Sequence, residues 1–110
     1  MKDSTIYLKH ILDSIVKIEK YTKKGRPQFF SDALTQDAVI RNLEIIGEAV
    51  KGLPAKLKKD HPGIPWRAIA GLRDILIHEY FGVDHEIVWG VVSKRIPILK
   101  RHIQAMLLKK

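Results

Sequence analysis

The chain of 110 residues contains no cysteine. This absence excludes a disulfide scaffold, thiol catalysis and zinc sites built from cysteine. Long apolar runs are also missing, because no stretch approaches the roughly 20 residues that span a bilayer. Asp3, Lys9 and Asp13 interrupt the apolar positions of the N-terminus, so we expect neither a signal peptide nor an anchor there. The expectation is a soluble, cytoplasmic protein with no membrane contact.

Signals for β-structure are absent as well. No stretch shows the alternation of apolar and polar residues that marks a strand, and there is no Asn-Gly or Asp-Gly hairpin turn. Hydrophobic residues make up 45% and charged residues 29%, which is typical of a globular chain. The length fits one domain with its own core. We therefore predict an all-α fold, an antiparallel bundle of four to five helices forming a single domain over residues 1–110.

Acidic residues are scarce relative to basic ones. Twelve Asp and Glu stand against twenty Lys and Arg, which gives a net charge of +8. A surface of this charge attracts polyanions and accelerates their association. The alternative is a soluble protein that is basic without binding any polyanion.

The apolar residues recur at the helical spacing in four segments, and a fifth, short helix can form between the chain breaks at residues 52–54 and 61–65. We expect helices over residues 3 to about 22, 31 to about 50, 54 to 60, 65 to about 80 and 84 to about 108. The second should start near Ser31-Asp32 and bury a stripe of apolar residues, namely Leu34, Val39, Leu43, Ile46 and Val50, widened by Ile40 and Ala49. Its polar residues should lie mostly outside that stripe, namely Asp37, Arg41, Asn42, Glu44 and Glu48.

Single residues set the expected ends of these helices. Asp3 or Ser4 can cap the first helix, and Gly25-Arg26-Pro27 should end it. Asp84 is a good N-cap for the last helix, and Pro97 inside that helix should kink it or split it in two.

The helix expected over residues 65–80 combines an apolar stripe with a concentration of polar groups. At about 100° per residue, one arc should face the core, and it contains Ala68, Ile69, Leu72, Ile75 and Leu76. Asp74 and His78 lie one turn apart on another face, together with Arg67 and Gly71, while Arg73 and Tyr80 lie on the shoulder between. Asp74 can orient the His78 imidazole and favour its protonated form.

Arg73 and His78 are about 140° apart around this helix, so they converge if the arginine wraps round the helix or if a second copy faces the first. Gly71 on the His78 face permits close approach of another helix, and mixed small, apolar and polar groups are typical of an interface. We therefore expect a two-fold homodimer with this helix pair at its centre.

An arginine and a histidine without a metal can cleave RNA, because RNA supplies its own 2′-hydroxyl nucleophile. His78 would move the proton at that hydroxyl or at the leaving oxygen, and Arg73 would stabilise the phosphate charge. Tyr80 could position the phosphate or sugar. On spacing alone, a lone helical histidine is more often structural than catalytic.

Other candidates are less specific. Basic residues without any acid follow Gly90, and with Arg67 they form a possible RNA-binding edge or merely a solvated face; the candidates are Arg67, Lys94, Arg95, Lys100 and Arg101. Trp66 and Trp89 could stack bases but suit core or interface positions better. Glu44 and Glu48 have no histidine at Glu-x-x-His spacing, so we predict no metal site and no cofactor.

Several segments together resemble the HEPN superfamily, specifically HepT-type toxins of prokaryotic toxin–antitoxin pairs. Arg73-Asp74 and His78-Glu79-Tyr80 match the family's R-x4–6-H motif with its following x-Y, and Asp74 stands where asparagine is also common. Residues 36–49 resemble the family's second helix, and residues 64–66, residues 81–84 and Trp89 also fit.

The resemblance implies an all-helical homodimer whose composite active site is a metal-independent endoribonuclease, with Arg73 and His78 as catalytic residues. It also implies a partner, a minimal nucleotidyltransferase antitoxin that uses ATP to attach AMP to the motif tyrosine, here Tyr80. Two alternatives stay open. One is a catalytically silent nucleotide- or RNA-binding module that partners a nucleotidyltransferase, and the other is a helical adaptor whose polar motif fixes the dimer register.

Overall fold

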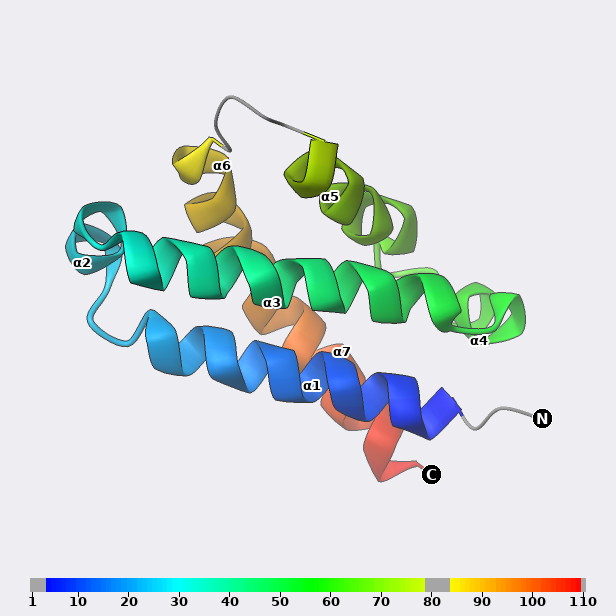
Figure 1. Ribbon diagram of the computed structural model, residues 1–110. Coiled ribbons are helices and arrows are strands. Elements are labelled where there is room, and N and C mark those ends of the chain that lie inside the picture. Colours follow the sequence, from blue (N-terminus) through cyan, green and yellow to red (C-terminus); the bar gives the residue numbers. More distant parts are fainter. Residues whose placement is uncertain (1–3, 79–83, 110) are drawn as a thin grey trace.

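Two long antiparallel helices form the body of the molecule (Figure 1). The computed structural model describes residues 4–78 and 84–109, with the backbone but not the side chains of residues 73–78. Helix α1 (Ser4–Tyr21) and helix α3 (Ala33–Gly52) pack along their length. α1 buries Leu8, Ile11, Ile15 and Ile18 at the helical spacing that the sequence predicts. The all-α prediction is confirmed, since the described part of the chain contains no strand.

The turn between these two helices contains a short helix that the sequence analysis did not predict, α2 (Arg26–Ser31). Gly25 precedes it with a φ of 88°, a backbone conformation that glycine adopts without a Cβ penalty. Pro27 occupies the first turn, where a missing N–H is tolerated. Asp32 then caps α3 as expected, because its carboxylate accepts a hydrogen bond from the Leu34 N–H at 3.1 Å.

Two predictions about α3 are wrong. Leu34 is 81% exposed, whereas Val39, Leu43, Ile46 and Val50 are buried. Leu34 precedes Val39 by five residues, which turns it about 140° away from the buried stripe. Asn42 is buried rather than exposed, because it lies at the edge of that stripe. Its Nδ2 donates to the Ala38 carbonyl of the same helix at 2.9 Å, while its buried Oδ1 has no hydrogen-bond partner among the described residues.

The segment after α3 positions the next long helix. Helix α4 (Ala55–Asp60) agrees with its predicted bounds and leads into a turn before α5 (Trp66–His78). Trp66 is 8% exposed, and its indole N–H donates to the carbonyls of Lys58 and His61 at 3.1 and 3.0 Å. These bonds fasten the start of α5 to the end of α4.

The last predicted helix is divided, as Pro97 implied. It consists of α6 (His85–Gly90), the π-helical turn η1 (Val91–Arg95) and α7 (Ile96–Leu108). Asp84 caps α6, because its carboxylate accepts a hydrogen bond from the Glu86 N–H at 2.9 Å. A proline ring clashes with the carbonyl four residues earlier, here that of Ser93, and the wider π turn before Pro97 relieves that clash.

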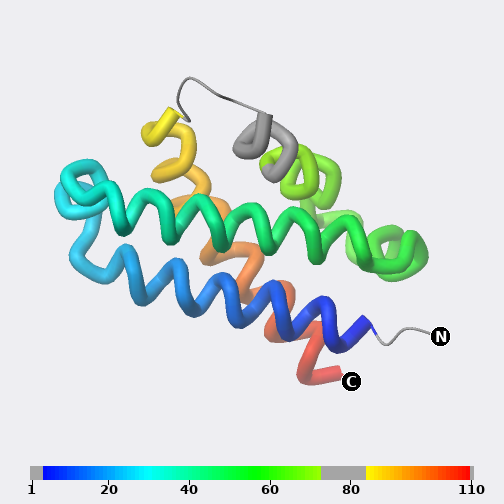
Figure 2. Tube along the Cα trace, in the orientation of Figure 1, coloured from blue at the N-terminus to red at the C-terminus, as the bar shows by residue number. Residues whose placement is uncertain are grey.

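The helices are arranged in layers around α3. The trace in Figure 2 shows α3 between α1 and α5. Helix α7 packs on α1, and α5 packs on α3. Among residues 4–78 and 84–109, no helix combines the length and apolarity that crossing a membrane requires.

Candidate functional site

The predicted motif lies on α5. The backbone is helical through Arg73, Asp74 and His78, while the side chains of all three lie outside the described part of the structure. Tyr80 lies outside it altogether. A continuous helix fixes the angular relation of the motif positions: Asp74 and His78 are one turn apart, and Arg73 and His78 are about 140° apart around the axis.

The orientation of α5 differs from the prediction at its first half. Ala68, expected in the core, is exposed, and Ile69 and Leu72 are only half-buried. Trp66 is buried, and Ile69, Ala70 and Leu72 all pack half-buried against the core, so the first half of α5 faces the core with these residues and not with Ala68. Among the described elements, α3 is the main neighbour of α5, and Ala68 remains exposed beside this contact. Ile75 and Leu76 lie outside the described side chains.

Gly71 lies on the part of α5 that faces away from this contact. Apart from its chain neighbours and the adjacent backbone of α5 itself, a Cβ at Gly71 would meet no described atom within 4 Å. Glycine costs about 1 kcal/mol relative to alanine in a helix interior, and nothing in the described chain uses the space that this glycine leaves. The open position is the one that the sequence analysis associated with close approach of another helix.

An ion pair joins α2 to α6, the first element after the motif. The Arg26 guanidinium contacts both carboxylate oxygens of Glu86 at 2.6 Å and lies 4.4 Å from the centre of the Phe30 ring. The hydrogen bond from Arg26 lowers the pKa of Glu86, and the same bond raises the pKa of Arg26. Both side chains are half-exposed, so the ion pair adds little to the stability of the fold. Its main effect is to hold α6 in place relative to α2.

Aromatic packing strengthens the same junction. The buried Phe29 ring lies 5.3 Å from the Trp89 ring and 6.1 Å from the His85 ring, centre to centre. Trp89 is half-buried in this cluster and Trp66 is anchored by hydrogen bonds, so both tryptophans have structural contacts. The cluster and the ion pair together fix the position of α6.

The basic residues predicted to bind RNA are spread over three elements. Arg67 is exposed on α5, Lys94 and Arg95 are exposed on η1, and Arg101 is exposed on α7. Lys100 differs from them, because its ammonium contacts the Glu19 carboxylate of α1 at 2.9 Å and its side chain is 29% exposed. Lys100 therefore joins α7 to α1, a role that spacing along one helix could not indicate.

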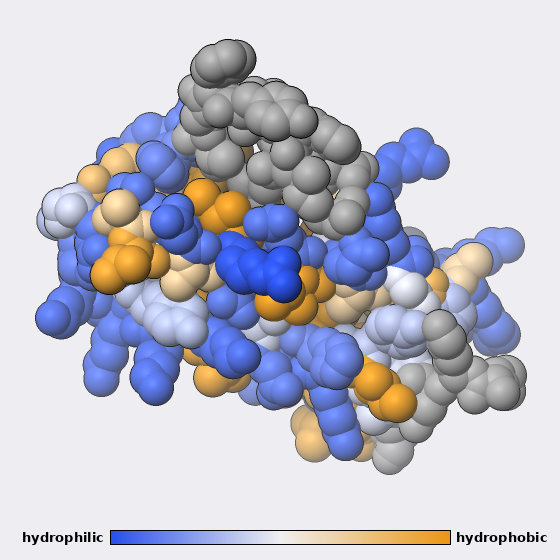
Figure 3. All heavy atoms as spheres, in the orientation of Figure 1, coloured by the Kyte–Doolittle hydropathy of each residue, from blue (hydrophilic) through white to orange (hydrophobic). Residues whose placement is uncertain are grey.

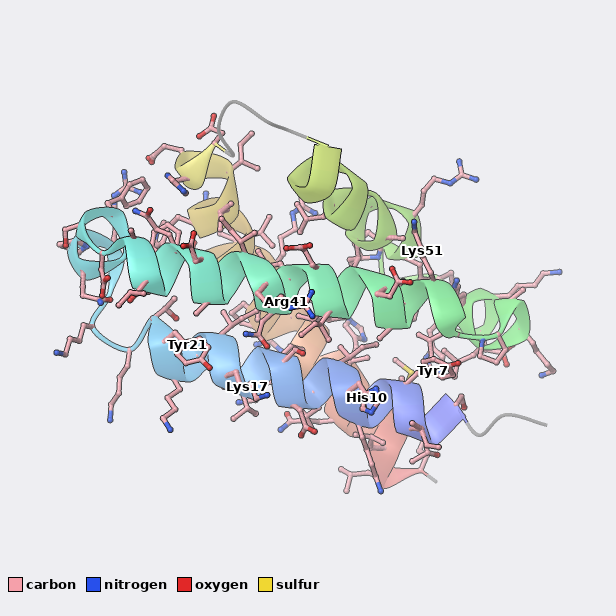
Figure 4. All side chains as sticks on the ribbon, viewed as in Figure 1. Tyr7, His10, Lys17, Tyr21, Arg41 and Lys51 are labelled. Carbon is pink, nitrogen blue, oxygen red and sulfur yellow. The ribbon has the colours of Figure 1, made fainter. Side chains whose placement is uncertain are left out.

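A shallow hollow between α1 and α3 brings together residues that the sequence analysis kept apart (Figure 4). It has a volume of about 310 Å³, and its polar lining consists of Tyr7, His10, Arg41, Glu44 and Glu48. The fold thus adds His10 to the pair of glutamates. Among the described side chains, those of residues 4–72 and 84–109, however, no group of three or more His, Cys, Asp or Glu is placed to hold a metal ion. The two carboxylates also make the hollow a poor site for a polyanion.

A layered all-α bundle whose motif helix follows a proline-rich turn and carries Arg-x4-His defines the class of the protein. Within that class, the family model described as Ribonuclease HepT-like matches residues 11–106. The chain belongs to this family, which is the HepT-like branch of the HEPN superfamily.

Curated relatives agree with this assignment. The chain is 54% identical over 103 residues to a Methanocaldococcus jannaschii protein named "Gamma-glutamylcyclotransferase and putative RNase", covering 93% of the chain but only 46% of that relative. It is 44% identical over 110 residues to a "Putative RNase" of Caldanaerobacter subterraneus, covering 99% of the chain and 98% of the relative. It is 50% identical over 95 residues to the "Probable ribonuclease HepT" of Thermococcus cleftensis, covering 86% of each. No solved structure is a significant match to the chain.

Proposed function

We propose that the chain is a metal-independent endoribonuclease that acts as the toxin of a pair neutralised by a nucleotidyltransferase. The observation that carries the proposal is the Arg73-x4-His78 motif on the continuous helix α5 of a Ribonuclease HepT-like chain. The net charge of +8 favours binding of a polyanion such as RNA. Three relatives whose names contain RNase or ribonuclease point to the same substrate.

The reaction follows from the chemistry of the two side chains. The RNA 2′-oxygen attacks the neighbouring phosphorus, a new 2′-O–P bond forms, and the P–O bond to the 5′-oxygen breaks. His78 accepts or delivers the proton at one of these oxygens, and Arg73 stabilises the charge on the phosphate oxygens. The products are a cyclic phosphate and a free 5′-hydroxyl, and Asp74, one turn before His78, orients the imidazole.

A homodimer can bring Arg73 and His78 together, which a single α5 helix does not do. Arg73 and His78 are about 140° apart on α5, so His78 of one copy meets Arg73 of the other if two α5 helices face each other across a two-fold axis. The open position at Gly71 supports this arrangement, because it leaves room on α5 for another helix. The active site is therefore composite, with each copy contributing one of the two groups.

The partner would inactivate the site through Tyr80. The nucleotidyltransferase transfers AMP from ATP to the Tyr80 phenol, forming an O–P bond and releasing pyrophosphate. The attached nucleotide carries negative charge two residues from His78, so it excludes RNA by steric overlap and by repulsion of like charges. Incubation with the nucleotidyltransferase and ATP should give an AMP adduct at Tyr80 by mass spectrometry, and an adduct found only at other residues would refute this site.

Cleavage in EDTA tests the catalytic assignment. The purified protein, free of its partner, should degrade RNA in EDTA, and His78→Ala or Arg73→Ala should reduce the rate by at least about 100-fold while the protein stays dimeric. His10→Ala and Arg41→Ala are matched controls, since both residues are exposed on other helices, and they should keep the wild-type rate. Equal rates for wild type and both motif variants would instead support the catalytically silent partner module.

A further inference from the structure

An apolar groove runs between the first half of α5 and the η1–α7 segment. Its volume is about 520 Å³. Helix α3 forms the floor, while α5 and α7 form the walls; the apolar side chains include Leu43, Ile46, Ala68, Leu72, Ile98 and Leu99. It is larger than the hollow between α1 and α3, and its lining is mainly aliphatic.

The walls of this groove remain accessible to solvent. Ile98 is 48% exposed, Ala68 is exposed, and Leu72 is half-buried. Ala68 and Leu72 belong to the apolar arc of α5 that the sequence predicted to face the core. In the structure they line an apolar surface that no described element covers. A concave apolar surface flanked by polar groups is typical of a binding surface for another helix.

The edges of the groove are basic. Arg95 and His102 supply the polar groups of its lining, and no acidic residue of the described chain lines it. No acidic residue occurs anywhere in the chain after Gly90. An occupant with carboxylates along its flanks would gain charge complementarity at these edges, whereas a basic occupant would be repelled.

A second copy of the chain fits this groove less well. The other exposed large apolar residues of the described chain are Ile6, Val16, Tyr21, Leu34, Ile87 and Leu108. They do not form the stripe at i, i+3 or i+4, and i+7 that would fill a groove. On the face that Figure 3 shows, the apolar patches are likewise separate from one another. Two copies docked groove to groove would also bring the Arg95 guanidinium groups of both copies into one interface without any described carboxylate in the groove lining to pair with them.

We infer that the groove binds an amphipathic helix of a protein partner, with apolar side chains one turn apart in the groove and carboxylates along its edges. Leu72 and Ile98 contact the apolar side chains from the two walls. Arg95 of η1 and His102 of α7 bind carboxylates along that wall of the groove. This docking does not require RNA cleavage, so it stands or falls independently of the proposed ribonuclease activity.

Fluorescence anisotropy with synthetic helical peptides tests the inference. The probe is a labelled 15-residue peptide with leucines at positions 3, 7, 10 and 14 and glutamates on both flanks, designed on the helical period. We expect it to bind the full chain, and to lose at least about tenfold in affinity when lysine replaces glutamate or serine replaces leucine.

Variants of the protein test whether the peptide binds in the groove. Ile98→Asp and Ala68→Asp should each weaken binding of the glutamate peptide at least about tenfold, and Arg95→Glu at least about fivefold. Leu34→Asp and Arg101→Glu are the matched controls, because they make the same changes at exposed positions outside the groove, and they should bind as wild type does. Circular dichroism establishes that each variant is folded.

Three results would overturn the inference. One is equal binding, or absence of binding, of the glutamate and lysine peptides. Another is sedimentation showing that Ile98→Asp and Ala68→Asp convert a dimer to a monomer, which would make a second copy the occupant. The third is loss of single-stranded RNA binding in these two variants without any binding of the peptide.

Discussion

Asp32 shows how one residue couples two helices. Its carboxylate accepts hydrogen bonds from the Thr35 hydroxyl at 2.9 Å, from the Leu34 N–H at 3.1 Å and from the Gln28 amide at 2.9 Å. These bonds, with that from Thr35 the largest cause, hold the pKa of Asp32 below its ordinary value. The residue that ends α2 is therefore also the N-cap of α3.

The lowered pKa predicts an acid dependence of stability. The pKa of Asp32 is lower in the folded than in the unfolded chain. The ionised carboxylate therefore stabilises the fold fully at pH values above the unfolded pKa, and this stabilisation is lost as the pH falls through the folded pKa. Asp32→Ala should lower the melting temperature at neutral pH, with a smaller loss at pH about 2. Thermal melts across this range, with Asp37→Ala as the exposed control on the same helix, test this. An equal loss at both pH values would contradict it.

Helix α5 carries a prediction that separates folding from assembly. Gly71→Ala should stabilise the isolated folded chain by about 0.4–1 kcal/mol, because alanine favours a helix interior and the added methyl group meets no described atom within 4 Å. If two copies approach at Gly71, the same methyl group should weaken the dimer and slow RNA cleavage. Denaturation at low protein concentration and sedimentation at high concentration measure the two effects. A more stable variant with unchanged dimerisation would remove Gly71 from the interface.

At the scale of the helices, amphipathic spacing predicted the long helices, whereas the short helix α4 was expected from the chain breaks on either side of it. Spacing failed at α2, whose six residues are too few to show a period and include Pro27. It also failed at Leu34 and Ala68, where apolar character was taken to mean burial. Leu34 is out of phase with its own stripe, and Ala68 faces a groove that α3 and α7 leave open. The error at Leu34 was visible in the spacing itself, whereas the error at Ala68 depends on which neighbours pack against the helix, which a local pattern does not contain.

Across the whole molecule, the sequence located the candidate motif but not its surroundings. Arg73 and His78 were identified from their types and spacing, and the structure places both positions on one continuous helix. Contacts between distant segments were not predictable from spacing, as with the Arg26–Glu86 pair, the Lys100–Glu19 pair and His10 beside Glu44. Each joins residues on different helices, so it depends on how those helices pack.

The composite site makes a prediction about mixed dimers. Arg73→Ala and His78→Ala are each expected to be inactive alone, because every site then lacks one group. When the two variants exchange subunits, a mixed dimer regains one site, formed by His78 of the first chain and Arg73 of the second. Random exchange makes about half of the dimers mixed, with one intact site of two, so the mixture should recover about a quarter of the wild-type activity.

The most direct measurement is therefore the rate of RNA cleavage in EDTA by an equimolar, subunit-exchanged mixture of Arg73→Ala and His78→Ala. We expect the mixture to cleave RNA at about a quarter of the wild-type rate, and we expect neither variant to be active alone. A mixture that stays inactive although sedimentation shows mixed dimers, while the wild type cleaves RNA, would contradict a site built from two copies of α5.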